Sequence, residues 1–100
     1  MMSMDAKARR ALLTIRDCVA ERRYRVLPHF TQRMDERGLF WPNVQTILDD
    51  PTDVRDGGAD RWDRPKWIVK GESAAGDKLG LVCVLDRDEQ GKLTVFISIY

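Results

Sequence analysis

The spacing of the apolar residues changes near residue 53, and this change constrains the fold more than any other feature of the sequence. Before it, apolar residues such as Leu12, Ile15 and Val19 recur at three- and four-residue steps, as in amphipathic helices. After it come short apolar runs and strict alternation, as in strands. Helices that precede strands in a chain of 100 residues indicate an α+β domain.

Three helices are expected in the first half of the chain, over residues 5–21, 29–37 and 42–51. Pro28 suits the first turn of the second helix, and Gly38 can end that helix in the left-handed conformation. The run YRVL at 24–27 predicts a short strand, and the following proline places it at a sheet edge.

The second half predicts an antiparallel meander. DVRD at 53–56 is a brief extended segment before the loop GGAD at 57–60, and WDRPKWIVKG at 62–71 is a strand interrupted by Pro65. KLGLVCVLD at 78–86 is almost wholly apolar and is therefore expected to be central. KLTVFISIY at 92–100 alternates, which places Thr94, Phe96, Ser98 and Tyr100 on one face.

These elements predict one α+β domain over residues 1–100, with two to three N-terminal helices packed on one face of an antiparallel β-meander. No apolar run approaches the ~18 residues of a membrane span, so no membrane partner is expected. The opening MMSMDAKARR lacks the apolar stretch of a secretory signal, and a cytoplasmic protein is expected.

The cysteines and the single histidine argue against a metal centre. Cys18 and Cys83 lie in apolar patterns and are expected to be buried and reduced. One histidine and two distant cysteines give no zinc-ligand spacing. We expect no metal and no cofactor.

Charge is unevenly distributed along the chain. Residues 1–33 carry eight Lys or Arg and three acidic residues, a balance of +5, and the remainder carries −4. Such a chain can present a basic face to phosphate while its net charge stays at +1. An ordinary helix with solvated arginines accounts for the same pattern.

The stretch HFTQRMDERG at 29–38 contains the most specific candidate site. His29, Arg33 and Arg37 follow at four-residue steps and so form one stripe on a helix, at the border of the core. Two guanidinium groups can bind one phosphate, and a neutral imidazole can act as a general base. The purely structural alternative is that Arg33 pairs with Glu36, Arg37 pairs with an acid elsewhere, and His29 only begins the helix.

Aromatic residues supply two further candidates. Tyr100 can donate a proton or stack on a base. In RWDRPKWIVK, basic residues alternate with Trp62 and Trp67, a composition that suits single-stranded nucleic acid. Trp67 is expected in the core and Trp62 at the surface.

The order of these motifs carries a resemblance. HFTQRMDERG, then WPNVQTILDDP, then WIVKG, LGLVCVLD and LTVFISIY resemble small bacterial domains of unknown function that carry H-x-x-x-R-M-x-x-R-G, a helix ending in D/N-P and a meander ending in I-x-x-Y. Those domains are similar to the RelE/ParE and MqsR-type toxins of toxin–antitoxin modules. The resemblance covers residues 10–100.

The resemblance implies a RelE-like fold and a metal-independent endoribonuclease that cleaves messenger RNA, with ribosome-bound mRNA as one substrate and a cognate antitoxin as partner. In such enzymes the 2′-hydroxyl of the RNA attacks the scissile phosphate, so no protein nucleophile is needed. The implied catalytic residues are His29 as base, Arg33 as phosphate donor, and Tyr100 as acid or stacking group. The implied RNA-binding residues are Arg37, Lys70, Lys78 and Trp62.

Two other function classes remain open from the sequence. A non-catalytic protein-binding or regulatory module of the same fold would use the helix stripe and a sheet edge to bind its partner. A DNA-binding accessory protein would use the basic first helix, and its affinity would fall steeply with salt. The sequence sets neither the oligomeric state nor an RNA sequence preference.

Overall fold

The α+β class predicted from the sequence is confirmed by a computed structural model, which describes residues 5–100. Residues 1–4, on which part of the argument against a secretory signal depends, lie outside the described residues. The elements are, in order, α1 (Ala6–Ala20), β1 (Tyr24–Val26), α2 (Pro28–Glu36), α3 (Trp41–Asp49), β2 (Asp53–Ala59), β3 (Pro65–Glu72), β4 (Lys78–Asp88) and β5 (Gly91–Ile99).

The sheet is mixed, which corrects the prediction of a wholly antiparallel one. Its strand order is β1-β5-β4-β3-β2, in which β2 to β5 form the expected antiparallel meander. The exception is β1, which pairs parallel with β5. The connection between them contains α2, α3 and three strands, and is long enough for the crossover that parallel pairing requires. As predicted, β4 is central and the YRVL segment lies at an edge.

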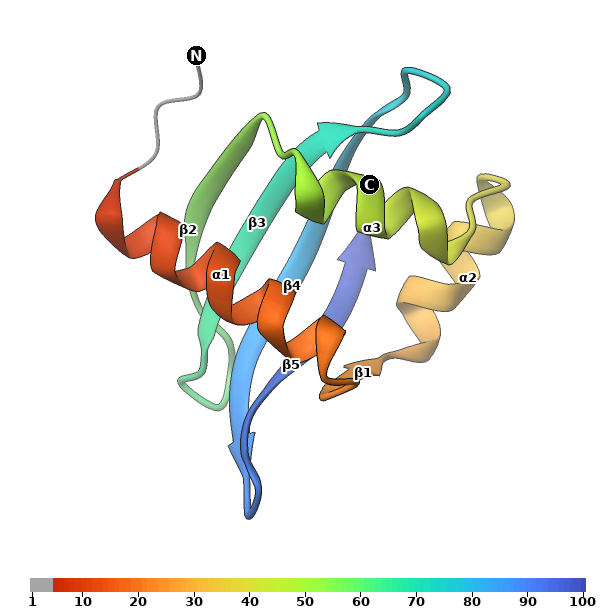
Figure 1. Ribbon diagram of the computed structural model, residues 1–100. Helices are drawn as coiled ribbons and strands as arrows, with labels where there is room; N and C mark the ends of the chain where they lie inside the picture. Colours follow the sequence, from red (N-terminus) through yellow and green to blue (C-terminus); the bar gives the residue numbers. More distant parts are fainter. Residues whose placement is uncertain (1–4) are drawn as a thin grey trace.

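The helices cover one face of the sheet (Figure 1). α1 and α3 cross that face, whereas α2 lies beside β5. Their apolar stripes, including Ile15, Phe30 and Ile47, pack on the strand residues that point toward them. Among residues 5–100, no helix is both long and apolar enough to span a membrane. We call the other side of the sheet, which these helices leave uncovered, the open face.

Local interactions explain where the helices begin and end. The side chain of Asp5 accepts a hydrogen bond from the Ala8 amide at 2.7 Å and so caps α1. Pro28 occupies the first turn of α2, and Gly38 follows that helix at φ +65°. Arg16 of α1 donates to carbonyl groups at the C-terminal end of α3, which joins the two helices.

The core contains the residues that the apolar patterns predicted. Trp67, Cys18 and Cys83 are all buried, and both cysteines are free thiols. Burial raises the pKa of the Cys83 thiol far above its ordinary value, so this thiol is inert at neutral pH. An aromatic cluster forms where Phe96 meets the rings of Phe30, Trp41 and Tyr24.

The segment predicted as the loop 57–60 is mostly strand. β2 continues to Ala59, and its register with β3 shifts between Asp56 and Ala59. Glycine permits this path, because a Cβ at Gly57 would lie 3.3 Å from Lys66 and Gly58 has φ +85°. Close approach of the two strands therefore accounts for Gly57, and the left-handed conformation at the register shift accounts for Gly58.

A bulge in β5 overturns the predicted face of Tyr100. Cys83 pairs with Phe96 and Val82 pairs with Ser98, so Ile97 is an extra residue. Thr94 and Phe96 are fully buried under the helices, whereas Ser98 and Tyr100 fall on the open face after the bulge. One inserted residue exchanges the two faces of a strand, so strict alternation fails from that point on.

Candidate functional site

The bulge brings Tyr100 to a cavity at one end of the open face. This cavity has a volume of about 440 Å³, within the range of small-molecule sites. It contains three of the residues predicted from the sequence, Lys70, Lys78 and Tyr100. We call it the Lys70 cavity. The complete lining is Thr52, Lys70, Gly71, Glu72, Lys78, Leu79, Gly80 and Tyr100.

Tyr100 is held at the cavity by its backbone and by the space that a glycine provides. Its amide and carbonyl exchange hydrogen bonds with those of Gly80 at 3.0 and 2.8 Å. A Cβ at Gly80 would lie only 2.6 Å from Cζ of the Tyr100 ring, so the ring occupies the volume that any side chain there would need. The ring is nonetheless 45% exposed and can contact a ligand from its free side.

The two lysines of the cavity have no ion-pair partner among residues 5–100. Asp53 lies opposite Lys70 in the sheet, but its carboxylate binds Arg55 at 2.8 Å. Glu72 lies opposite Lys78 without forming an ion pair. The ammonium groups are therefore free to bind an anion, and the one carboxylate of the lining, Glu72, is free to accept a proton.

The α2 stripe does not line this cavity, and of its three residues only Arg33 is hydrogen-bonded to a neighbour of Tyr100. Arg33 donates from Nε to the carbonyl of Ile99 at 3.5 Å, next to Tyr100 in the chain. It also pairs with Glu36 at 3.9 Å, as the structural alternative expected. His29 and Arg37 are exposed, and neither belongs to the lining. The structure thus brings Arg33 near Tyr100 and leaves His29 and Arg37 on the adjoining helix surface.

Trp62 lies at the other end of β3, away from Lys70. It is 66% exposed, as expected for a surface tryptophan, and the guanidinium groups of Arg61 and Arg64 each lie 4.9 Å from its ring centroid. It therefore does not share a cavity with the other predicted RNA-binding residues.

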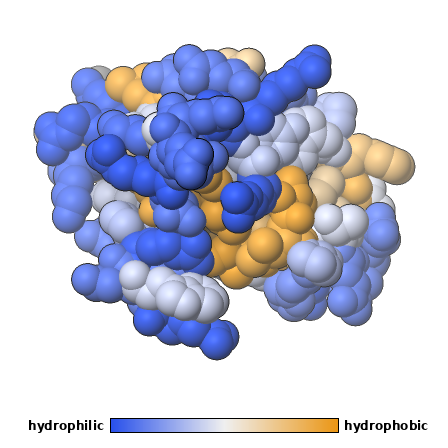
Figure 2. Space-filling model, turned by 90° about the horizontal axis from the view of Figure 1, so that it is seen from below, coloured by the Kyte–Doolittle hydropathy of each residue, from blue (hydrophilic) through white to orange (hydrophobic). Residues whose placement is uncertain are grey.

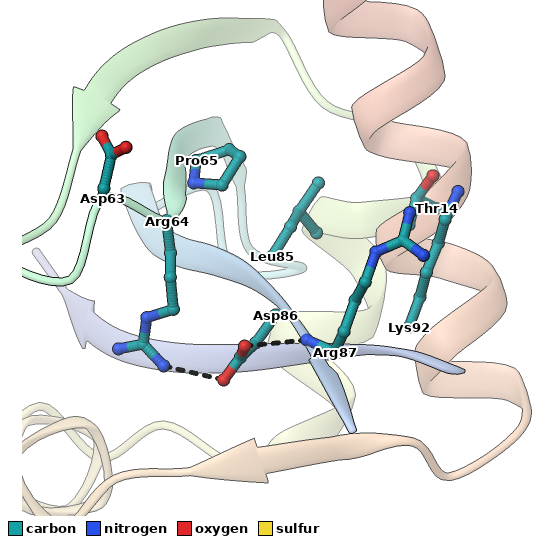
Figure 3. A pocket seen from close by; sticks show the side chains of 8 residues that line it. All are labelled: Thr14, Asp63, Arg64, Pro65, Leu85, Asp86, Arg87 and Lys92. Carbon is teal, nitrogen blue, oxygen red and sulfur yellow. Dashed lines mark hydrogen bonds and ion pairs between the residues drawn. The ribbon is translucent and has the colours of Figure 1, made fainter. Parts of the chain in front are cut away.

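Around Trp62, charged groups are paired with each other. Arg64 binds Asp60 at 2.7 Å. It also binds Asp86 at 2.8 Å, as Figure 3 shows. Desolvation acts to raise the pKa of Asp60, but hydrogen bonds from Arg64 and from the Trp62 amide outweigh it and hold that pKa below its ordinary value. The pKa of Asp86 is also lowered, first by the Arg87 amide and then by Arg64.

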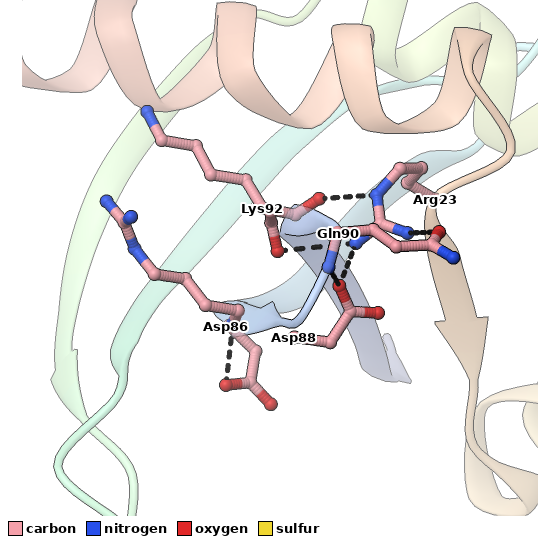
Figure 4. A network of polar contacts seen from close by, with 7 residues as sticks. Arg23, Asp86, Asp88, Gln90 and Lys92 are labelled. Carbon is pink, nitrogen blue, oxygen red and sulfur yellow. Dashed lines mark hydrogen bonds and ion pairs between the residues drawn. The ribbon is translucent and has the colours of Figure 1, made fainter.

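A second paired network joins the segment between α1 and β1 to the β4–β5 hairpin (Figure 4). Arg23 donates to the side chains of Asp88 and Gln90 and to the carbonyl groups of Lys92 and Gly91. The hydrogen bond from Arg23 to the Asp88 carboxylate, followed by one from the Gln90 amide, lowers the pKa of Asp88. Seen from this end, the surface shows a central apolar area with hydrophilic residues around much of it (Figure 2).

Sequence reasoning missed Glu72, Thr52 and Gly80. Glu72 could not be identified from the sequence, because its position in the cavity depends on the pairing of β3 with β4. The Thr52 amide donates to the Lys70 carbonyl at 2.8 Å, a contact across β2 and β3 that no local pattern marks. For Gly80 one signal was available in the sequence. This residue lies inside the apolar run LGLVCVL, and a glycine within a strand indicates that another group approaches its backbone closely.

No group of three or more His, Cys, Asp or Glu side chains among residues 5–100 is placed to hold a metal ion. The Lys70 cavity offers other chemistry: two ammonium donors, a carboxylate, a phenol and an aromatic face. Comparisons with protein-family models, curated proteins and solved structures found no match to this chain.

Proposed function

We propose that this protein is the toxin of a toxin–antitoxin module, with a RelE-like fold, and that it cleaves RNA at the Lys70 cavity without a metal ion. The observation that carries the proposal is the cavity itself. Lys70 of β3, Lys78 of β4 and Tyr100, which directly follows β5, line one space. The ammonium groups of the two lysines have no carboxylate partner among residues 5–100.

This arrangement suits a nucleotide. The ammonium groups of Lys70 and Lys78 can neutralise the scissile phosphate, and the exposed face of Tyr100 can stack on a base. Arg33, bound weakly to the Ile99 carbonyl, can turn toward a second phosphate at little cost. Such a site resembles those that recognise single-stranded RNA by stacking and charge rather than by groove geometry.

Cleavage needs one proton acceptor and one proton donor. A base removes the 2′-hydroxyl proton, the 2′-oxygen forms a bond to phosphorus, and the bond to the 5′-oxygen breaks as that oxygen takes up a proton. The products are a 2′,3′-cyclic phosphate and a 5′-hydroxyl. Tyr100 is the proposed donor, and the proposed acceptor is His29 or Glu72, of which Glu72 lines the cavity.

The test is cleavage of a short single-stranded RNA by purified protein in the presence of EDTA. We expect 5′-hydroxyl and cyclic phosphate ends, and no cleavage of the 2′-deoxy analogue, because that analogue lacks the attacking group. Lys70→Gln/Lys78→Gln should abolish cleavage. The matched control Arg9→Gln/Arg10→Gln removes the same charge from exposed positions on α1 and should retain it.

The proton acceptor can be identified with the same assay. If His29 is the base, His29→Ala removes cleavage and Glu72→Gln does not, and the reverse holds if Glu72 is the base. Loss of growth on induced expression, reversed by a co-expressed antitoxin, tests the cellular part of the proposal. No arrest and no RNA cleavage by a folded protein would exclude a toxin.

A second candidate function is binding without cleavage, as in a regulatory module. The observation that favours it is the position of His29, which is exposed on α2 and outside the cavity. In that case RNA or a protein partner would bind with an affinity that depends on Lys70 and Lys78, and no cyclic phosphate would form.

A further inference from the structure

Two cations face each other across the β4–β5 hairpin. Arg87 and Lys92 are directly paired in the strand register. Like charges at such positions destabilise a hairpin, and natural sheets usually place opposite charges there. Both side chains are exposed, and neither forms an ion pair among residues 5–100.

Arg87 and Lys92 also line a cavity of about 410 Å³ between the hairpin and α1 (Figure 3). Their charged ends point toward Thr14 of α1 in this view, and Leu85 and Pro65 supply apolar parts of the wall. We call this space the Arg87 cavity. It lies at the end of β4 opposite Lys78, so it is separate from the Lys70 cavity.

The other polar groups of this cavity are already engaged or lie apart. Asp86 is bound by Arg64 and by the Arg87 amide, so it does not neutralise the Arg87 guanidinium. The Thr14 hydroxyl donates its proton to the Arg10 carbonyl at 2.9 Å, so Thr14 lines the cavity with its hydroxyl already engaged. Asp63 is the remaining carboxylate, and it lies on the far side of the cavity from Arg87 in Figure 3.

We propose that Arg87 and Lys92 form a second anion site, which binds a phosphate group in the Arg87 cavity. An arginine fork and a lysine ammonium that converge on one space are a pair of groups suited to phosphate oxygens. A bound phosphate changes the repulsion between the two cations into attraction for a shared anion. The inference does not depend on the proposed RNA cleavage, because a free phosphate group is sufficient ligand.

The test is a titration of the wild-type protein with inorganic phosphate, followed by NMR of backbone amides at constant ionic strength. We expect saturable shifts at Arg87, Lys92 and the neighbouring Leu85. Arg87→Gln/Lys92→Gln should weaken phosphate binding by about tenfold or more, since it removes both charged contacts. Arg9→Gln/Arg10→Gln, which removes the same charge elsewhere, should bind as the wild type does.

The proposal is overturned if the control pair weakens binding equally, or if the shifts follow ionic strength alone. It is also overturned if phosphate shifts only the residues of the Lys70 cavity. RNA oligonucleotides of increasing length then identify the source of the phosphate. If the site binds the RNA backbone, only the longer oligonucleotides lose affinity in the double variant; if it binds free phosphate, none does.

Discussion

The two ends of the sheet use their cations differently. At the end with the β2–β3 loop and the β4–β5 hairpin, Arg23 and Arg64 are bonded to carboxylates, and Arg23 also donates to backbone carbonyl groups. At the other end, Lys70 and Lys78 line a cavity without a carboxylate partner among the described residues, and Tyr100 covers its floor at Gly80. Arg87 and Lys92 are exceptions at the first end, because neither forms an ion pair among residues 5–100.

This comparison separates cations that hold the fold from cations that are available to a ligand. A cationic side chain that is bonded to carboxylates or carbonyl groups contributes to stability and has few free donors for an anion. A group of cations without partners, gathered in a concave site, has a small effect on stability and a large one on binding. Substitutions at the two ends should therefore affect different measurements.

The largest effect on stability is expected for Arg23→Gln. This substitution removes hydrogen bonds to two side chains and two carbonyl groups that join the segment between α1 and β1 to the hairpin. We expect the free energy of unfolding to fall by about 2 kcal/mol, against roughly 0.5 kcal/mol or less for Lys70→Gln. Urea denaturation followed by circular dichroism measures both. Equal losses in the two variants would remove the distinction between the ends.

Gly80→Ala should impair the Lys70 cavity without unfolding the protein. The added methyl group would occupy the position of the Tyr100 ring, which can move because it is half exposed. We expect the affinity for single-stranded RNA to fall by about tenfold, as for Tyr100→Ala, from lost stacking. The double variant should be no worse than either single one, since both remove one contact. Ser98→Ala on the same face is the control.

Acid should affect the paired end. The folded-state pKa values of Asp60, Asp86 and Asp88 lie below the ordinary value of 3.8, so the unfolded chain binds more protons as pH falls. The stability they contribute is present above that value and is lost as pH falls through the folded-state values. Thermal midpoints should therefore drop below about pH 4, and should drop less in Asp60→Asn/Asp88→Asn. If the thermal midpoint of that variant depends on pH as the wild type's does, these ion pairs are not the cause of the acid sensitivity.

The smallest effect is expected for Lys92→Glu. It replaces a like-charge pair across the hairpin by an opposite-charge pair with Arg87. We expect the free energy of unfolding to rise by about 0.2–1 kcal/mol, and phosphate binding at the Arg87 cavity to disappear. A loss of stability in urea would show that the two cations are separated by more than their register indicates.

Much of the fold follows from local patterns. Apolar spacing and prolines predicted all three helices to within a few residues, and the apolar run of β4 predicted its central position. The parallel pairing of β1 with β5 was missed, because no local pattern states which distant strand an edge strand will join. The strand at Gly57-Gly58 was missed because paired glycines are typical of turns.

The candidate site was less predictable than the fold. In KLTVFISIY each residue is acceptable on either face, so nothing in the sequence marks the bulge at Ile97. Yet that bulge decides whether Tyr100 faces the helices or Lys70. Glu72 lines the cavity because the register of β3 and β4 places it opposite Lys78. Trp62 was predicted to bind RNA with the lysines, but it lies at the other end of β3.

Binding of a short single-stranded RNA shows whether Lys70 and Lys78 form the RNA site. Its affinity would be measured for the wild type, for Lys70→Gln/Lys78→Gln and for Arg9→Gln/Arg10→Gln at one fixed salt concentration, because phosphate contacts depend on salt. We expect the lysine variant to lose about tenfold or more in affinity and the control, with the same net charge, to lose far less. Equal losses in both variants would mean that RNA responds to overall charge, and would contradict the assignment of the Lys70 cavity as its site.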